Sequence, residues 1–132
     1  MEESALYYRD GEQTPHLVVA ETHLPDGTVK TVRENAVFLR SPQENRDVSL
    51  YDDLREVVAI FPEVEAGSCT RSVFVTEEET FRVPGEFMTS INLSNYWPRA
   101  ALRFTAVVPE EVAGRIQFWN KGTRLQPERA PA

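Results

Sequence analysis

The sequence contains little cysteine and no long hydrophobic run. Its single cysteine, Cys69, cannot form a disulfide bond within the chain. A membrane-spanning helix needs about eighteen or more consecutive apolar residues, and because no such run is present we expect no membrane insertion. The first residues, MEESALYYRDG, show neither the basic nor the apolar region of a secretion signal.

Positive charge is also scarce. The chain carries 14 Lys and Arg residues against 21 Asp and Glu residues, which gives a formal net charge of −7. Phosphate backbones and anionic lipid surfaces are bound mainly by clustered Lys and Arg, whereas the basic residues here are scattered. We therefore expect no nucleic-acid partner and no attachment to an anionic membrane surface.

The chain does contain many short segments with the apolar pattern of β-strands, separated by proline and glycine turns. Residues 55–61 are almost continuously apolar, which is typical of a strand covered on both faces, and residues 101–108 alternate most clearly. The Pro25-Asp26-Gly27 sequence predicts a hairpin turn between residues 18–24 and 28–33. The alternation slips by one within residues 28–32, which suggests a bulge there. Further strands are predicted at residues 4–9, 35–39, 70–76, 87–93 and 115–119.

Helical patterns are few, because only residues 50–58 and 109–113 could form a helical turn or two. About eight short strands with frequent turns predict an all-β fold, specifically an antiparallel β-sandwich-like domain with little helix. A chain of 132 residues has the length of one domain. We expect this domain over residues 1–126 and a disordered tail at residues 127–132.

Candidate catalytic and metal-binding residues form no recognisable motif. Cys69 could be a nucleophile with His16 or His23 as its base, but it opens a predicted strand, which is not where activated thiols usually lie. The two histidines lie on opposite faces of one strand unless a bulge intervenes, so we expect no shared metal ion. The acidic groups at residues 52–53, 63–65 and 77–79 lack the ligand series of a calcium loop. We predict no catalytic residue, no cofactor and no metal site.

Three pairs of adjacent aromatic residues are the strongest indication of a binding surface in the sequence. Tyr7-Tyr8, Tyr96-Trp97 and Phe118-Trp119 could supply a stacking surface for a sugar or a partner protein, although simple alternation would bury one member of each pair. A carbohydrate- or peptide-binding β-sandwich that uses Tyr96, Trp97 and Trp119 is therefore one hypothesis. A small hydrolase that uses Cys69 is another.

Several segments occur in an order that resembles a known family. They are LYYRDGEQTPHLVVAETHLPDGTVKTV, DVSLYDDLREVVAIFPEVEAGS, VPGEF and WPRAALRFTAVVP. The resemblance runs from about Leu6 to Val112. This set is similar to the transglutaminase-associated bacterial domain of unknown function. That module precedes a transglutaminase-like core, a papain-type cysteine hydrolase, in exported or envelope-associated proteins.

The resemblance implies an all-β module without recognised catalytic residues, an accessory role beside an enzyme, and a periplasmic or other extracytoplasmic location. Two departures from the family pattern are visible. The opening strands of the family, upstream of Leu6, are missing, so the chain resembles a shortened or partial member. The transglutaminase-like core is absent as well, and its Cys…His…Asp order would require a histidine after Cys69, whereas His16 and His23 precede it.

Our first hypothesis is accordingly a non-enzymatic accessory or interaction domain. Its partner would be a transglutaminase-like or other protein domain, and unpaired edges at residues 6–9 or in the PHLVVA strand could also give a homodimer. The possible binding surface consists of Tyr96, Trp97, Trp119, Asp53 and Phe87. The expected docking or turn positions are Asp26, Gly27, Asp53, Phe61, Pro62, Gly67, Pro84, Gly85 and Phe87, of which the Gly and Pro positions serve backbone geometry.

Overall fold

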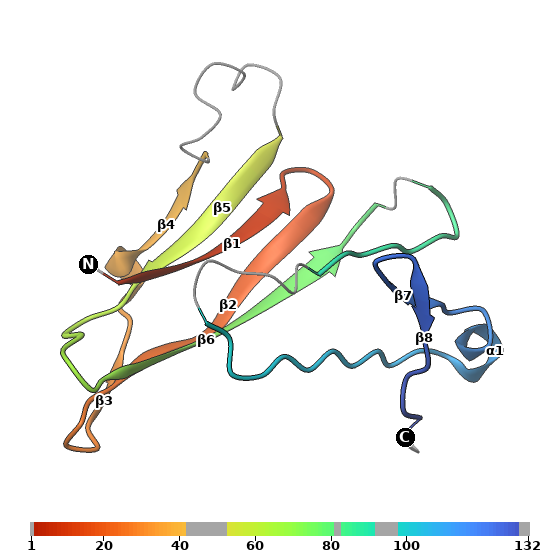
Figure 1. Cartoon of the computed structure of the whole chain (residues 1–132). Helices are drawn as coiled ribbons and strands as arrows, with labels where there is room; N and C mark the ends of the chain where they lie inside the picture. Colours follow the sequence, from red (N-terminus) through yellow and green to blue (C-terminus); the bar gives the residue numbers. More distant parts are fainter. Residues whose placement is uncertain (1, 42–52, 81–82, 92–97, 130–132) are drawn as a thin grey trace. The chain divides into compact units, whose positions relative to one another are not determined.

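The structure is a computed structural model that describes residues 2–41, 53–80, 83–91 and 98–129. The chain divides into two compact units, Met1–Met88 and Thr89–Ala132, which are described separately. Its strands are antiparallel and its helices are short (Figure 1), which confirms the predicted all-β class with little helix. None of the helices in the described ranges has the length and apolar character needed to cross a membrane.

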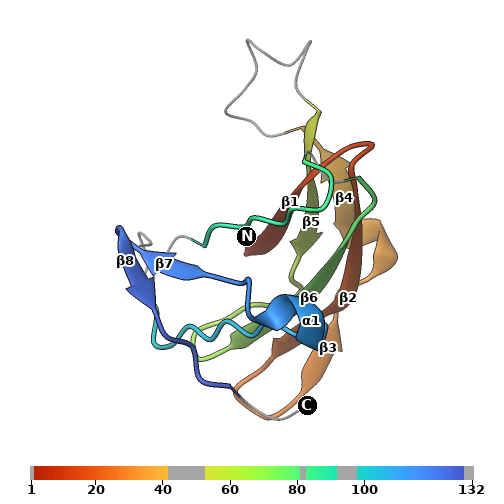
Figure 2. The same cartoon turned by 90° about the vertical axis from the view of Figure 1, so that its right-hand side faces the viewer.

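The described residues of the first unit form two three-stranded antiparallel sheets. One has the strand order β1-β5-β4 and the other the order β3-β2-β6. Figures 1 and 2 both show β1, β5 and β4 as neighbours, and β2 beside β6. The strands are β1 (Glu3–Arg9), β2 (Gln13–His23), β3 (Val29–Thr31), β4 (Val37–Arg40), β5 (Leu54–Ile60) and β6 (Cys69–Glu78), and a short 3-10 helix, η1 (Glu34–Ala36), precedes β4.

Strand β5 is the centre of the first sheet. It pairs with β1 on one side and β4 on the other, and its residues Val58 and Ala59 are completely buried. This confirms the strand predicted from the continuous apolar run. The helical turn considered at residues 50–58 is not formed where the structure describes these residues, since β5 already begins at Leu54.

A small hydrophobic core joins the two sheets. Ala20 from β2 packs with Ala59 from β5 and with Phe61, and Leu17 and Val32 cover this cluster. Phe61 is 6% exposed, and its backbone N–H donates to the carbonyl of Glu2 at 3.0 Å. Our placement of Phe61 on a docking surface was therefore wrong. Its large apolar ring stabilises the core because it is removed from water.

The predicted hairpin is formed by β2 and β3. Gly27 adopts a positive φ of 87°, the Asp26 carboxylate accepts a hydrogen bond from the Thr28 N–H at 2.8 Å, and the Leu24 N–H donates to the Thr28 carbonyl at 2.8 Å. The irregularity lies elsewhere than predicted. The register shifts between Leu17 and Val19 of β2 against β6, not within residues 28–32.

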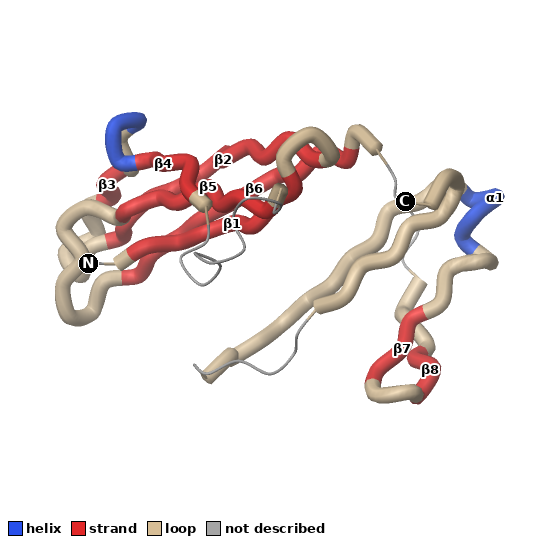
Figure 3. The backbone as a smooth tube through the Cα atoms, turned by 90° about the horizontal axis from the view of Figure 1, so that it is seen from above, coloured by secondary structure: helices blue, strands red, loops and turns tan. Residues whose placement is uncertain are grey.

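The second unit contains less regular structure than the sequence predicts. Its described residues contain one helical turn, α1 (Glu110–Ala113), as predicted, and one hairpin of the short strands β7 (Phe118–Asn120) and β8 (Thr123–Leu125), shown in Figure 3. Residues 101–108 and 87–91 form no strand, and residues 92–93 lie outside the described part. The two strand predictions therefore fail for these residues, because alternation specifies a strand only where a neighbour supplies the backbone hydrogen bonds.

Candidate functional site

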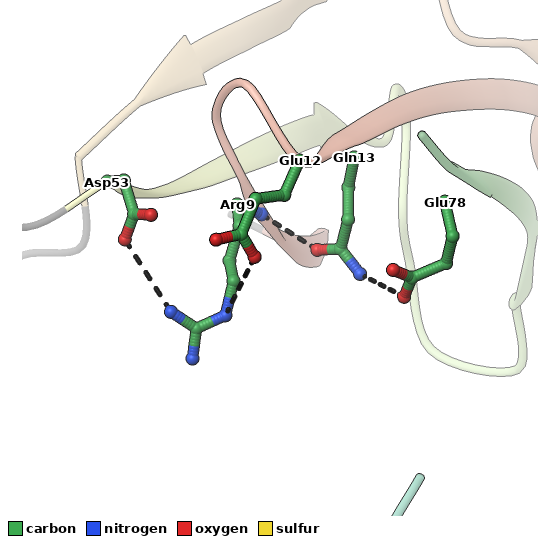
Figure 4. A network of polar contacts seen from close by, with 5 residues as sticks. All are labelled: Arg9, Glu12, Gln13, Asp53 and Glu78. Atoms are coloured by element: carbon green, nitrogen blue, oxygen red, sulfur yellow. Dashed lines mark hydrogen bonds and ion pairs between the residues drawn. The ribbon is translucent and has the colours of Figure 1, made fainter. Parts of the chain in front are cut away.

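A network of polar contacts surrounds the turn between β1 and β2 (Figure 4). The Arg9 guanidinium lies 4.0 Å from the Glu12 carboxylate and 3.6 Å from the Asp53 carboxylate. The Gln13 side chain accepts a hydrogen bond from the Arg9 N–H at 2.8 Å and donates one to Glu78 at 2.7 Å. Asp53, predicted as a surface residue, thus holds the start of β5 against the turn.

Backbone hydrogen bonds fix the same turn. The Asp10 N–H donates to the Asp53 carbonyl at 2.8 Å, and the Glu79 N–H donates to the Glu12 carbonyl at 2.9 Å. The network therefore connects both sheets at one end of the unit. Its ion pairs are partly exposed, and such pairs each contribute only about 0–1 kcal/mol. Local sequence does not indicate these contacts, because Asp53 and Glu78 are far from the turn along the chain.

Four reactive or charged side chains lie together on the outer face of the second sheet. In the antiparallel register Glu21 is opposite Arg71, and His23 is opposite Cys69. The Glu21 carboxylate lies 2.8 Å from Nε2 of His23 and 3.2 Å from the Arg71 guanidinium. These hydrogen bonds, that to His23 first, lower the pKa of Glu21 below its ordinary value. Cys69 is a free, exposed thiol.

The two histidines share a face after all. His16 is opposite Val75 and His23 is opposite Cys69, and the bulge between Leu17 and Val19 restores the same parity. The two positions are nevertheless separated by six residues of β6, roughly 20 Å along a strand. A shared metal ion is thus excluded by distance, and not by the opposite faces that we expected. In the described ranges no group of three or more His, Cys, Asp and Glu side chains could hold a metal ion.

A buried carboxylate lies on the central strand of the first sheet. Glu56 of β5 is 3% exposed, and it accepts a hydrogen bond from Nε of Arg40 on β4, whose Nη2 also binds Glu3 of β1 at 2.8 Å. The hydrogen bonds to Glu56 and Glu3 raise the pKa of Arg40. Arg40 thus links all three strands, and the arrangement has the character of a structural ion pair.

The predicted aromatic surface is only partly described. Tyr96 and Trp97 lie outside the described residues. Trp119 of β7 is 58% exposed, lies opposite Arg124 of β8, and donates from its indole N–H to the side chain of Gln117 at 3.3 Å. Its neighbour Phe118 contacts Phe104 edge-to-face, with ring centroids 5.9 Å apart. The structure therefore leaves an indole face available to a ligand.

The remaining predicted positions lie at turns or at the end of the first unit. Phe87 is 68% exposed and Met88 is 95% exposed. Gly27 and Gly67 belong to two turns that approach each other, since Pro25 lies beside Gly67. Strand β8 was not predicted at all, although Lys121 and Gly122, both with positive φ, form the two-residue turn that often joins strands. Pro62, Pro84 and Gly85 carry no contact that indicates a ligand in the described part of the chain.

Comparison with known proteins identifies a similar family and a similar fold. A family model described as "Domain of Unknown Function with solved-structure structure (DUF3857)" matches residues 2–131. A crystal structure described as a "putative protease" from Parabacteroides distasonis ATCC 8503 is similar with a TM-score of 0.56 and 24% sequence identity. The similar region covers 62% of this chain and 16% of that protein, so this chain spans a small part of its length. No curated protein matches.

Proposed function

Because the chain belongs to the DUF3857 family, we propose that it is a non-catalytic accessory domain that binds a catalytic domain of the transglutaminase-like class. The order of the segments from Leu6 to Val112 supports this choice of partner, since it resembles modules that precede such enzymes. The similar region of the Parabacteroides protein makes up 16% of that chain. A fold of this kind therefore occurs as one part of a longer protein.

The observation that carries the proposal is the exposed apolar surface of the β7–β8 hairpin. Trp119 is 58% exposed and Leu125 is 45% exposed, and the described residues of the second unit include no buried side chain. Burying a large apolar side chain contributes roughly 1.5–3 kcal/mol. A partner that covers this hairpin would therefore gain favourable binding free energy, because the exposed apolar side chains would be removed from water.

Aromatic residues suit such a contact better than other side chains. Trp combines a large apolar face with one N–H donor, and tryptophan is enriched among the residues that dominate binding energies. Here Gln117 already satisfies the indole N–H, so a partner can cover the ring without leaving a buried donor unpaired. Trp119 is accordingly the residue that we expect to contribute most.

The first prediction tests this contact with purified proteins. We expect the chain to bind a transglutaminase-like domain encoded in the same polypeptide or by a neighbouring gene, and Trp119→Ala to weaken the Kd at least tenfold, because a central buried aromatic contributes roughly 2 kcal/mol or more. Isothermal titration calorimetry measures both values. Leu39→Ala is the matched control, since Leu39 is 69% exposed but lies on β4, and it should change the Kd less than twofold.

Absence of a complex at micromolar concentrations would contradict the accessory role. Equal losses for both variants would contradict the assignment of Trp119. The alternative function is binding of a carbohydrate or peptide, which the exposed indole face of Trp119 favours. Titration of tryptophan fluorescence with a panel of glycans and peptides separates the two, because a flat response together with domain binding removes the alternative.

A further inference from the structure

Strand β6 is an edge strand with one side open. The order β3-β2-β6 places β6 last in its sheet, and no other strand of the described ranges pairs with it. Its ten residues, Cys69–Glu78, therefore present a row of backbone N–H and C=O groups that an additional strand could satisfy. Such an edge binds an extended segment through main-chain hydrogen bonds, and alternate side chains give the specificity.

The two faces of β6 differ in character. The hydroxyl of Ser72 lies 3.0 Å from that of Ser4 on β1, so the face that carries Ser72 and Phe74 is the inner one. The opposite, outer face carries Val73 and Val75, and also the acidic Glu77 near the end of the strand. A strand that adds to this edge should therefore be apolar on one face, and basic where it meets Glu77.

Residues 101–108 have the pattern that this edge requires. The segment alternates with Leu102, Phe104, Ala106 and Val108 on one side and Arg103, Thr105 and Val107 on the other. All eight residues are exposed and none is in a strand. Leu102 and Phe104 are each 47% exposed and Val107 is 90% exposed. The sequence of this segment thus predicts a strand, but the segment pairs with no strand in the described part of the chain.

One antiparallel register satisfies both the apolar and the charge requirements. It places Phe104 opposite Thr76 and Ala106 opposite Phe74, so that the apolar side of the segment lies on the inner face of β6. The same register places Arg103 opposite Glu77 on the outer face, and Val107 opposite Val73. An opposite-charge or apolar cross-strand pair contributes roughly 0.2–1 kcal/mol each. A shift by one residue would turn the apolar side outward.

We propose that residues 101–108 of one copy pair in this register with the free edge of β6 in a second copy of the chain. Every chain carries one such segment and one such edge, so two copies can exchange them reciprocally. A reciprocal exchange closes with two-fold symmetry and leaves neither edge open. The contact does not use Trp119 or Leu125, the side chains on which the accessory function proposed above rests, although Phe104 contacts Phe118 beside Trp119.

The second prediction is a register-specific cross-link between copies. In a Cys69→Ser background, Val73→Cys and Val107→Cys should form a disulfide, because directly opposite residues in an antiparallel pair have Cα atoms about 4.5–5.5 Å apart, within the range of disulfides. Non-reducing electrophoresis should show a covalent dimer. The matched control combines Val73→Cys with Ala106→Cys, which lies on the other face and should not cross-link, and the two single variants show any disulfide between identical positions.

An exchange of the charges of Arg103 and Glu77 tests the same strand pairing without an engineered disulfide. Sedimentation equilibrium should show that Arg103→Glu raises the dimer Kd at least threefold, and that Glu77→Arg combined with Arg103→Glu restores it. A monomeric chain that still forms the Val73–Val107 disulfide would show that the segment pairs within its own chain. That result, or the absence of both cross-link and dimer, would overturn the proposal.

Discussion

At the scale of single residues, two glycines show how the turns of the first unit are constrained. Gly27 and Gly67 have nearly equal positive φ values of 87° and 86°. A Cβ atom on Gly27 would meet nothing within 4 Å, whereas one on Gly67 would lie 3.3 Å from Cγ of Pro25. The backbone therefore requires glycine at both positions, but only Gly67 also has a close neighbour.

The third prediction compares alanine at these positions. Both substitutions force a side chain into the left-handed region, which costs roughly 1–2 kcal/mol. Gly67→Ala should lower the free energy of unfolding further, by about 0.5 kcal/mol, since overpacking against a rigid ring adds to the backbone cost. Urea denaturation of the two variants measures the difference. Equal losses would mean that the Pro25 contact has no energetic effect.

The fourth prediction concerns the pH dependence that Glu21 gives to stability. Hydrogen bonds from His23 and Arg71 lower the pKa of Glu21 from its ordinary value of 4.5. A carboxyl group with a lowered pKa in the folded state stabilises the fold above its unfolded pKa, and this contribution is lost as the pH falls through the folded pKa. The advantage of the natural chain over Glu21→Gln should thus be fully present at pH 7, begin to fall near pH 4.5 and be lost at lower pH. Urea midpoints measured between pH 7 and pH 3 test this, and a difference that grows in acid would contradict it.

At the scale of elements, the first sheet combines a buried apolar strand with one buried charge. Val58 and Ala59 have no exposed surface, and Glu56 on the same strand is 3% exposed. Burial of an ionised carboxylate is unfavourable unless a cation and hydrogen bonds compensate it. Arg40 supplies both from the neighbouring strand β4. The pairing of β4 with β5 therefore brings the buried Glu56 carboxylate the cation that compensates its burial.

The fifth prediction measures the coupling energy between Arg40 and Glu56 by a double-mutant cycle. Arg40→Met should reduce the free energy of unfolding by about 1–3 kcal/mol, because it leaves the Glu56 carboxylate buried without its cation. This is less than for a fully buried pair, since the Arg40 side chain is 35% exposed. Arg40→Met combined with Glu56→Met should recover part of the loss, because the second change removes the unpaired charge. Thermal or urea unfolding of the three chains measures the coupling, and strictly additive losses would argue against it.

At the scale of the whole molecule, the first unit has a buried apolar core, whereas the described residues of the second unit include no buried side chain. The first unit buries Val57, Val58, Ala59 and Phe61 within paired sheets. The described residues of the second unit expose large apolar side chains and contain one short hairpin. Both proposals rest on exposed apolar side chains of the second unit, because a partner or a second copy that covers them removes apolar surface from water.

Much of the first unit could be predicted from local sequence. The continuous apolar run predicted β5, and Pro25-Asp26-Gly27 predicted the β2–β3 hairpin, because both signals act over a few residues. Phe61 was assigned to a surface and lies in the core, whereas Asp53 is an exposed residue whose ion pair with Arg9 was not predicted. Nothing local distinguishes these environments, since they arise from residues that are distant in sequence.

The all-β class, the turn positions of the first unit and the antiparallel character follow from local sequence, because apolar alternation and the conformational limits of proline and glycine are local properties. The identity of neighbouring strands, the position of the register shift and the contact between Arg40 and Glu56 depend on the folded chain. The folded chain also leaves residues 101–108 without a strand partner in its described part, because a strand is completed by the hydrogen bonds of a neighbour that local sequence does not specify.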